Sequence, residues 1–179
     1  MLKVDRILSQ PSFETERFLM RPMSVADQGP VAFYLQDERV ARMTTSTPHP
    51  LPPGAVEGLI TRALKEDRES DIWVIDGRAC DLSEVIGLVT LVRLGEQQAE
   101  LSYWIAPLFW NKGVASEVVQ GLVAQNPMSN STIFASVFQD NPASARVLTN
   151  CGFDYVGDAE AFSVARNASV PTWTYLKTF

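Results

Sequence analysis

The segment from Trp110 to Ser116 has the composition of a turn that opens a helix and holds an anion. The first turn of a helix leaves backbone N–H groups without partners at the positive end of the helix dipole, where a phosphate binds well. Gly113 permits a close approach of the backbone, Ala115 keeps the helix start narrow, and Lys112 adds a positive charge. The chain contains neither G-x-x-x-x-G-K-[ST] nor G-x-G-x-x-G. We therefore predict a phosphate-bearing ligand that is neither a P-loop nucleotide nor a dinucleotide.

Other common chemistries find few residues to carry them. His49 is the only histidine, and Cys80 and Cys151 are the only cysteines. These three residues make neither a disulfide framework nor a Cys/His zinc site, and one histidine leaves little room for a Ser-His-Asp hydrolase. We predict a site without a metal ion.

The charge balance limits the class of partner. The sequence has 15 Lys plus Arg against 21 Asp plus Glu, which gives a net charge of -6 and a pI near 4.8. Such a field disfavours binding to nucleic acid and suits a cationic or neutral partner.

Length and composition indicate a single globular domain over residues 1–179. Hydrophobic residues make up 46% and charged residues 20%, without linker-like stretches or repeats. A chain of this length buries roughly 70% of its unfolded surface. The Met1–Arg6 segment carries charges where an export signal needs an apolar run, and no window offers about 18 consecutive apolar residues. We expect a cytoplasmic protein that does not enter the membrane.

Hydrophobic periodicity places helices around the phosphate turn and elsewhere. The apolar residues between Gly54 and Asp67 recur at helical spacing, as do those between Ala115 and Val123, where Asn126-Pro127 ends the pattern. Pro142 to Asn150 predicts a short helix closed by Gly152. A further helix should follow Ser24-Val25-Ala26-Asp27, a capping-box pattern, with a kink or restart near Pro30. The proline-rich Thr44 to Pro53 segment must be a loop.

Alternating or β-branched runs predict the strands. Three antiparallel strands joined by hairpins should precede the phosphate turn, and a strand should follow the helix after it. The predicted strands are Arg17 to Met23, Ile72 to Ile75, Val85 to Leu94, Ala99 to Ile105, Thr132 to Phe138, Phe153 to Val156 and Thr172 to Phe179.

Four motifs, in order along nearly the whole chain, resemble those of the GNAT acyl-CoA-dependent N-acetyltransferases. The resemblance is greatest to the branch that acetylates N-termini of ribosomal proteins (RimJ/RimL-type). It implies a mixed α/β (α+β) fold with a mostly antiparallel sheet, about four flanking helices, and splayed fourth and fifth strands. The motifs are Glu14 to Pro22, Pro48-His49-Pro50, Ala99 to Ala106 with Phe109 to Glu117, and Asn141 to Leu148 followed by Cys151-Gly152-Phe153.

The resemblance assigns acetyl-CoA as acyl donor and gives roles to individual residues. The pyrophosphate would bind the backbone N–H groups of Asn111, Lys112, Gly113, Val114, Ala115 and Ser116. The pantetheine arm would pair with the strand edge from Trp104 to Ala106 and with Asn141. The N–H near Ile105 would stabilise the oxyanion. Ser144 would assist the departing thiolate. His49 and Tyr103 would shape the acceptor site.

The sequence departs from this family where acid and base residues are expected. Leu148 stands in place of a tyrosine acid, Val156 in place of a glutamate, and Trp110 opens the turn in place of Gln or Arg. Glu100 is a carboxylate near the site, but strand alternation puts it on the face opposite Tyr103 unless a bulge intervenes. The base is therefore either Glu100 or a water relay.

Several interpretations stay open at this stage. The acceptor could be a protein N-terminus or a small amine such as an antibiotic, a polyamine or an amino acid. The absence of a tyrosine at Leu148 and of a glutamate at Val156 also allows a silent acyl-CoA-binding module. Asn141 could cap its helix as well as bind a ligand. Oligomeric state, monomer or homodimer, is not determined by the sequence.

Overall fold

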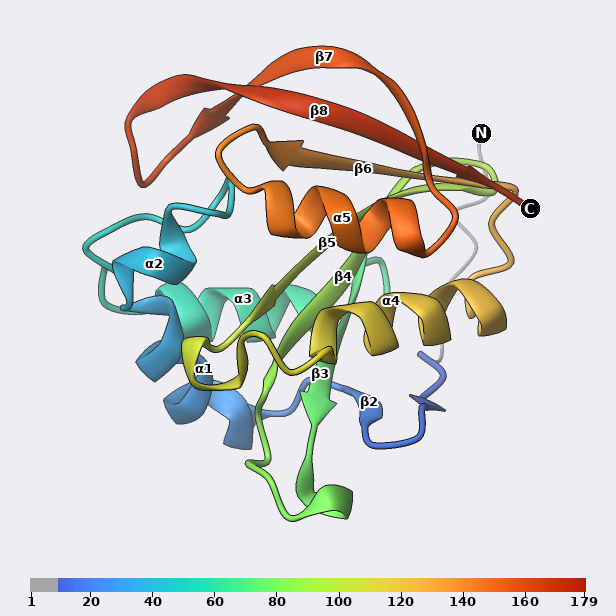
Figure 1. Ribbon diagram of the computed structural model, residues 1–179. Helices are drawn as coiled ribbons and strands as arrows, with labels where there is room; N and C mark the ends of the chain where they lie inside the picture. Colours follow the sequence, from blue (N-terminus) through green and yellow to red (C-terminus); the bar gives the residue numbers. More distant parts are fainter. Residues whose placement is uncertain (1–9) are drawn as a thin grey trace, which may run out of the picture.

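The computed structural model describes residues 10–179, and the Met1–Arg6 segment, on which the expectation of no export signal rests, lies outside this range. The described chain forms one eight-stranded sheet in the order β1-β2-β3-β4-β5-β6-β8-β7 (Figure 1). Every neighbouring pair is antiparallel except β5 and β6. The expected mixed α/β fold is confirmed. The strands are β1 (Phe13–Glu14), β2 (Leu19–Pro22), β3 (Ser70–Asp76), β4 (Gly87–Gly95), β5 (Gln98–Ile105), β6 (Thr132–Phe138), β7 (Asp154–Ser163) and β8 (Ala168–Thr178).

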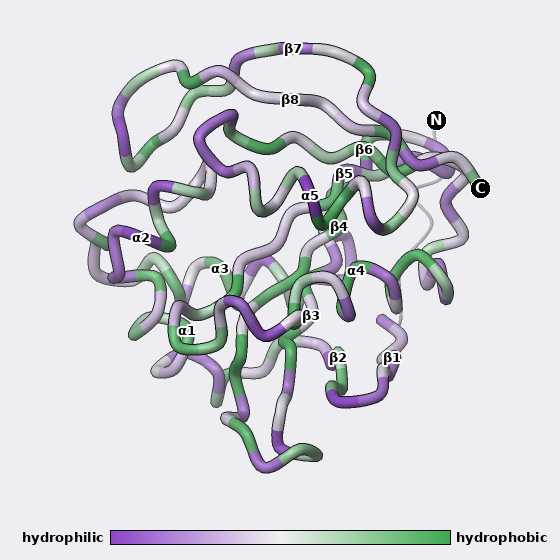
Figure 2. The backbone as a smooth tube through the Cα atoms, viewed as in Figure 1, coloured by the Kyte–Doolittle hydropathy of each residue, from purple (hydrophilic) through white to green (hydrophobic). Residues whose placement is uncertain are grey.

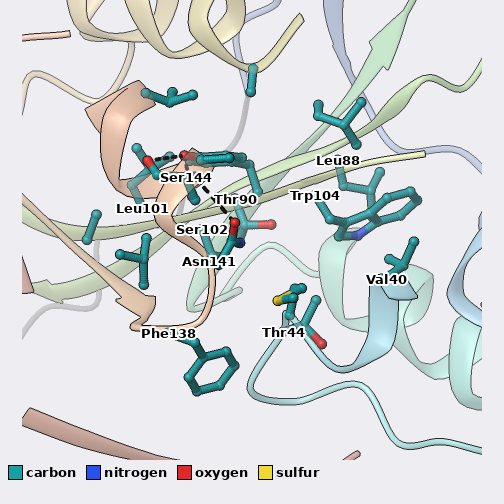
Figure 3. Close-up of a pocket in the computed structure, with 18 of the residues that line it drawn as sticks. Val40, Thr44, Leu88, Thr90, Leu101, Ser102, Trp104, Phe138, Asn141 and Ser144 are labelled. Atoms are coloured by element: carbon teal, nitrogen blue, oxygen red, sulfur yellow. Dashed lines mark hydrogen bonds between the residues drawn. The ribbon is translucent and has the colours of Figure 1, made fainter. Parts of the chain in front are cut away.

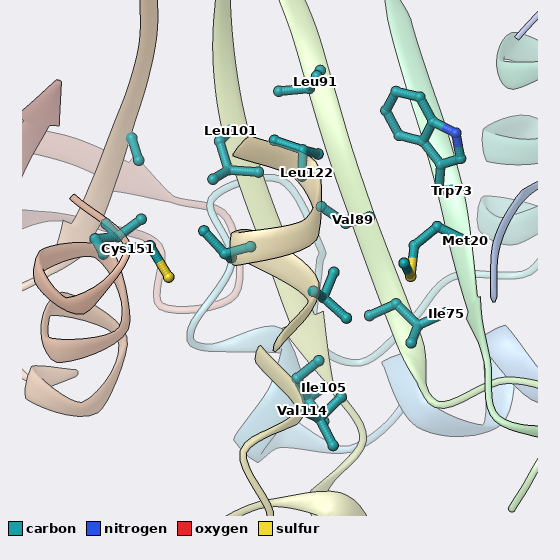
Figure 4. Packing of buried hydrophobic residues seen from close by; sticks show 14 of the residues in the cluster. Met20, Trp73, Ile75, Val89, Leu91, Leu101, Ile105, Val114, Leu122 and Cys151 are labelled. Atoms are coloured by element: carbon teal, nitrogen blue, oxygen red, sulfur yellow. The ribbon is translucent and has the colours of Figure 1, made fainter. Parts of the chain in front are cut away.

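Helices cover both faces of the sheet, and each layer has its own core. The larger core joins α4 and α5 to the sheet, with Leu122 and Val114 of α4 lying over β4 and β5 (Figure 4). The second core joins the three N-terminal helices to the opposite face, through residues such as Val31 and Ile60. The helices are α1 (Gln28–Leu35), α2 (Glu38–Ala41), α3 (Ala55–Ala63), α4 (Val114–Gln125) and α5 (Pro142–Asn150), with 3-10 turns η1 (Val25–Asp27), η2 (Arg78–Cys80) and η3 (Pro107–Phe109).

Hydropathy follows this layered arrangement. The central strands β3 and β4 are mostly hydrophobic along their length, because helices cover them on both sides, whereas the α2 region is hydrophilic (Figure 2). Trp73, in the middle of β3, is fully buried, and its indole N–H donates to the Pro11 carbonyl at 2.7 Å. The sheet therefore forms a rigid support for the loops at its ends.

Of the two alternatives predicted at Pro30, the structure shows the restart: the 3-10 turn η1 precedes α1, and Pro30 is the third residue of α1, where a missing N–H is harmless. Two other details of the predicted elements are wrong. The helix from Gly54 to Asp67 stops at Ala63. The last two strands are longer than expected and form a hairpin. The apolar pattern does not show their full length, because the polar residues of β7 lie in solvent at the sheet edge and interrupt it.

A buried ion-pair cluster attaches the first helical layer to the sheet. The guanidinium of Arg21 on β2 contacts Asp27 of η1 at 2.8 Å and Asp76 of β3 at 3.0 Å, and Arg78 also contacts Asp76 at 2.7 Å. Burial alone would raise the pKa of Asp76, but hydrogen bonds from Arg78 and Arg21 outweigh it and lower the pKa to about 2. Both carboxylates are therefore ionised near neutral pH and hold η1 in place.

The parallel pair β5–β6 opens along its length. Its ladder runs from Gln98 opposite Thr132 to Leu101 opposite Ala135, and no pairing continues to Ile105 or Phe138. The two strands therefore diverge at the end that leads into α4 and α5. This splay is the one that the family resemblance implies.

Candidate active site

A cavity of about 850 Å³ occupies the gap between β5 and β6 (Figure 3). Side chains of β5 alternate between the two faces of the sheet, yet residues of both sets line the cavity. Tyr103 and Ile105 come from the α4–α5 face, and Glu100, Ser102 and Trp104 come from the α1–α3 face. The cavity therefore reaches through the sheet and lets two ligands meet from opposite sides.

The peptide group of Ile105 faces this gap. Ala106 N–H donates to the Ile86 carbonyl on the β4 side at 2.9 Å. Because backbone groups alternate along an antiparallel strand, the N–H and carbonyl of Ile105 point the other way. An N–H at the open edge of a splayed strand suits the stabilisation of a developing oxyanion.

The neighbours of Ile105 cannot pair with a ligand as predicted for the Trp104–Ala106 edge. Both backbone groups of Ala106 are engaged, with the Ile86 carbonyl and with Phe109 N–H at 2.9 Å. The Trp104 carbonyl faces β4, since a Cβ at Gly87 would collide with it. A ligand strand would instead meet the peptide groups of Tyr103 and Ile105.

Trp110 closes part of this edge. Its indole N–H donates to the Ile105 carbonyl at 2.6 Å, and the Arg39 guanidinium lies 5.7 Å from the centre of its ring. The indole thus occupies one of the two backbone groups that Ile105 presents to the gap. The hydrogen bond joins residues five positions apart across the η3 turn, so it could not be read from periodicity.

The turn before α4 has the backbone of an anion site. Gly113 is the N-cap residue and has φ 72°, in the left-handed region that suits glycine. α4 begins at Val114, so the N–H groups of its first turn point out of the helix end beside the cavity. Asn111, Val114, Ala115 and Ser116 line the cavity together with Gly113. Lys112 does not belong to the lining, although its carbonyl takes part in the turn.

Arg17 reaches this turn from the segment before β2 and was not identified as a site residue from the sequence. Its Nη2 donates to the Lys112 carbonyl at 3.0 Å and lies 3.7 Å from where a Gly113 Cβ would stand. Glu117, in the first turn of α4, accepts hydrogen bonds from Arg17 N at 2.8 Å and Nε at 2.6 Å, and from Thr15 at 2.8 Å. A Thr-x-Arg segment far upstream and a glutamate in α4 give no local signal of this contact.

The electrostatics of Glu117 follow from these contacts. Burial alone would raise its pKa, but the hydrogen bonds from Arg17 and Thr15 outweigh burial and hold the pKa below its usual value. The carboxylate therefore stays ionised near neutral pH and orients the Arg17 guanidinium toward the turn.

Asn141 and Ser144 meet at the other wall of the gap (Figure 3). Asn141 is the N-cap of α5, and its Oδ1 accepts from Ser144 N–H at 3.3 Å, so the capping role is confirmed. The cap uses one lone pair of the amide oxygen, so the second lone pair and the amide N–H groups are left for a ligand. The Ser144 hydroxyl lies 2.7 Å from the Tyr103 hydroxyl.

Leu148 and Val156 lie in different surroundings. Leu148 is fully buried in the larger core, although it also touches the cavity wall, whereas Val156 is 53% exposed on β7 and does not line the cavity. The hairpin contributes a different carboxylate, that of Glu160, to the lining. The pairing of β7 with β8 changes register between Tyr155 and Gly157, before the strand reaches Glu160.

The α1–α3 face supplies polar groups from several elements. Glu100 and Ser102 of β5 lie there with Thr90 of β4, which pairs with Ser102. The register of β4 and β5 is regular from Glu100 to Ile105, so no bulge turns Glu100 toward Tyr103. It still reaches the cavity, because the cavity opens on both faces.

The loop after α2 also contributes, but not at the predicted residue. Residues 43–47 line the cavity, whereas His49 is exposed and does not. The acceptor role of His49 stays a prediction without a contact to support it. The earlier part of the loop is held at the turn between β7 and β8, where Val164 N–H donates to the Thr45 carbonyl at 3.0 Å.

Residues 10–179 contain no group of three or more His, Cys, Asp or Glu placed to hold a metal ion. In the same range no helix has the length and apolar character needed to cross a membrane.

The fold and the through-sheet cavity are those of an acyl-CoA-dependent N-acetyltransferase, and comparison with known families agrees. The chain belongs to the GNAT acetyltransferase family: residues 17–154 match the family model described as "Acetyltransferase (GNAT) domain". Membership of this family favours an acyl-CoA-dependent N-acetyltransferase over a silent acyl-CoA-binding module.

The chain is similar to one relative in sequence and to several solved structures in fold. The chain is 30% identical over 152 residues to the uncharacterised N-acetyltransferase YoaA of Bacillus subtilis (strain 168), covering 82% of this chain and 85% of the relative. The structure of RimL, the ribosomal L7/L12 alpha-N-protein acetyltransferase, in complex with coenzyme A superposes with a TM-score of 0.79 at 14% identity, covering 94% and 98% of the two chains. That of the microcin C7 self-immunity acetyltransferase MccE with acetyl-CoA and AMP gives 0.78 at 13% identity, covering 92% and 93%. Such low identities show the fold alone.

Proposed function

We propose that this chain transfers an acetyl group from acetyl-CoA to a primary amine, and that the amine is the α-amino group of a protein N-terminus. The observation that carries the proposal is the cavity through the β5–β6 gap, with a helix-turn anion site on one side and polar side chains on the other. When bound, acetyl-CoA supplies an activated thioester carbon. RimL, which shares the fold, is described as an α-N-protein acetyltransferase.

The residues on the α4–α5 face fit the donor. The N–H groups of Asn111 to Ser116 would hold the pyrophosphate, and the Arg17 guanidinium beside them adds charge. The Asn141 amide would bind the pantetheine arm, which would lie along β5 like an added strand. Ile105 N–H would stabilise negative charge on the thioester oxygen, and removal of such a donor costs about 2.7 to 4 kcal/mol.

The acceptor side suits an amine that needs little help to lose its proton. An α-amino group with pKa about 7.7 to 8.0 is roughly one-tenth neutral at pH 7, a penalty of about 1.4 kcal/mol, whereas a lysine with pKa about 10.4 carries about 4.6 kcal/mol. Glu100, alone or through a water molecule, would accept the proton that the amine loses on attack. A single carboxylate at the cavity wall is sufficient for an acceptor that is an α-amino group.

The charge of the cavity disfavours a polyamine. Within the described chain, the lining has two positive residues, Arg39 and Arg146, and two negative residues, Glu100 and Glu160. A polycation would gain from an excess of carboxylates, which this lining does not have. A small amine with one charge is the remaining alternative acceptor.

The test is a thiol-release assay with three acceptors: a peptide with N-terminal Ala or Ser and an internal lysine, the same peptide with a blocked N-terminus, and spermidine. We expect release of CoA thiol with the first acceptor alone. Equal turnover of the blocked peptide would show lysine acetylation, and turnover of spermidine alone would overturn the N-terminal acceptor. Calorimetric binding of acetyl-CoA is measured in parallel.

A further inference from the structure

Two hydroxyl groups meet beside the start of α5. Leu148 supplies no hydroxyl from the second half of α5, and its side chain is fully buried. Instead, the phenol of Tyr103 on β5 lies 2.7 Å from the hydroxyl of Ser144 on α5, and both residues line the cavity (Figure 3). The pair spans the splay, since its members come from the strand and the helix on either side of it.

The main-chain contacts of Ser144 fix its position. Its N–H donates to Asn141 Oδ1 at 3.3 Å, and its carbonyl oxygen accepts from the Tyr103 hydroxyl at 3.4 Å, whereas at Oγ either hydroxyl can be the donor. The phenol thus faces two oxygens of the same serine. If it donates to Oγ, the serine proton is free to turn toward the cavity.

The phenol is suited to donate a hydrogen bond and not to give up its proton. Burial raises the pKa of Tyr103 to about 12, even though the hydrogen bond with Ser144 acts in the opposite direction. A thiol has a pKa of about 8.5. Transfer of the phenolic proton to a thiolate would therefore run uphill, and the phenol stays protonated across the neutral range.

We propose that Tyr103 is a positioning residue for the acetyl transfer, which donates a hydrogen bond to Ser144 Oγ so that the serine hydroxyl points at the departing sulfur. The inference rests on the proposed function. As the amine nitrogen bonds to the thioester carbon, the C–S bond breaks and its electron pair stays on sulfur. Ser144 O–H donates a hydrogen bond to that sulfur, and the proton lost by the amine is accepted by Glu100 or water and later reaches the thiolate from solvent. Tyr103 and Ser144 keep their protons throughout.

The two hydroxyls should behave as one unit. A hydrogen bond to a charged group contributes about 1.5 to 3 kcal/mol and a neutral one about 1 kcal/mol. We therefore expect Ser144→Ala to lower kcat about 30-fold and Tyr103→Phe about 5-fold, with the KM for acetyl-CoA unchanged. In the Ser144→Ala background, Tyr103→Phe should cost less than 2-fold, because nothing remains for the phenol to orient.

The experiment measures steady-state kinetics of the wild type, both single variants and the double variant, from pH 6 to 9. Tyr155→Phe is the matched control, since its phenol donates to Asp158 at 2.7 Å on the exposed face of β7, outside the cavity. The shape of the pH profile should not change in Tyr103→Phe, because the phenol does not titrate in this range. Thermal unfolding of each variant separates loss of fold from loss of function.

The possible outcomes are distinguishable. Non-additive losses with an unchanged pH profile support the pair. Additive losses, or a larger loss in Tyr103→Phe than in Ser144→Ala, overturn the order of the relay, and loss of the alkaline limb in Tyr103→Phe shows a proton donor instead. Full activity of Tyr103→Phe overturns this inference alone, whereas a wild type that binds acetyl-CoA but acetylates no amine overturns the proposed function and the inference with it.

Discussion

The two sides of the β5–β6 gap are built in different ways. On the α4–α5 face, the turn from Asn111 to Ser116 and the start of α5 present mostly backbone groups, whose positions are set by the left-handed turn at Gly113 and the cap at Asn141. On the α1–α3 face, the wall consists of side chains from the loop after α2, from β4, from β5 and from β7. The donor side is thus a property of the fold, while the acceptor side is a property of individual residues.

This difference explains why one fold serves several acceptors. A substitution at Thr90 or Glu160 changes the acceptor wall without disturbing a helix cap or a strand ladder. A change at Gly113 or Asn141 alters the backbone itself. Each layer of helices also has its own ion pairs: Glu117 with Arg17 at the start of α4, and the cluster around Arg21 beside η1.

The largest effect should come from filling the donor turn. Gly113→Glu puts a side chain at φ 72° and a negative charge beside the phosphate site. We expect acetyl-CoA affinity to fall more than about 100-fold, which corresponds to about 3 kcal/mol. Calorimetry measures the affinity for acetyl-CoA. Gly29→Glu is the control, because it adds the same charge on α1 at a position with open space around it. Unchanged affinity would place the phosphate elsewhere.

The second-largest effect should be a loss of stability where η1 and α1 pack on the sheet. Asp27 is 1% exposed, and Arg21 donates to both of its oxygens, at 3.0 and 2.8 Å. Asp27→Asn leaves a buried guanidinium short of a counter-charge, so we expect a loss of about 3 kcal/mol in the free energy of unfolding at pH 7. Urea denaturation measures it. Asp158→Asn, at an exposed carboxylate, is the control.

The pH dependence of this loss has a definite sign. Burial alone would raise the pKa of Asp27, but the hydrogen bonds from Arg21 and Ser24 outweigh burial, and the pKa lies below its usual value. A lowered pKa adds stability that is present above the unfolded value, about 3.9, and is lost as pH falls through the folded value. The difference between wild type and Asp27→Asn should therefore shrink below pH 4, and a difference that grows there would contradict the ion pair.

A smaller, purely kinetic effect is expected at the acceptor wall. Glu100→Gln removes a proton acceptor but keeps the size of the side chain. We expect kcat/KM for an N-terminal peptide to fall about 10-fold at pH 7, less than the roughly 100-fold or more of a typical general base, because water also accepts the proton. The deficit should narrow toward pH 9, as the amine itself becomes neutral. Thiol release across this range measures it, and Glu96→Gln, outside the cavity, is the control.

The same contrast decides what the sequence can predict. The donor turn, Asn141 and Ser144 lie in short continuous segments with strong local rules for caps and glycine turns, and the structure brings them to one cavity. The contact of Arg17 with Glu117 spans 100 residues. Likewise, Glu160 reaches the cavity only because β7 extends past its apolar start. Such contacts depend on strand order and register, which local periodicity does not encode.

The smallest effects, on acetyl-CoA affinity and on stability, are expected at Glu117. Glu117→Gln keeps an acceptor oxygen for Thr15 and the Arg17 main-chain N–H, but it replaces the oxygen that accepts from Arg17 Nε and loses the charge that orients the guanidinium toward the Lys112 carbonyl. We expect acetyl-CoA affinity to fall about 3-fold and stability at pH 7 by about 1 kcal/mol, as for a half-exposed ion pair. Because the Glu117 pKa is lowered, its stabilisation is present above about pH 4.3 and disappears at lower pH. Calorimetry and urea denaturation at pH 7 and pH 4 measure both, with Glu38→Gln on α2 as control. An effect on acceptor KM without one on acetyl-CoA would mean that the anchor of Arg17 serves the other side of the gap.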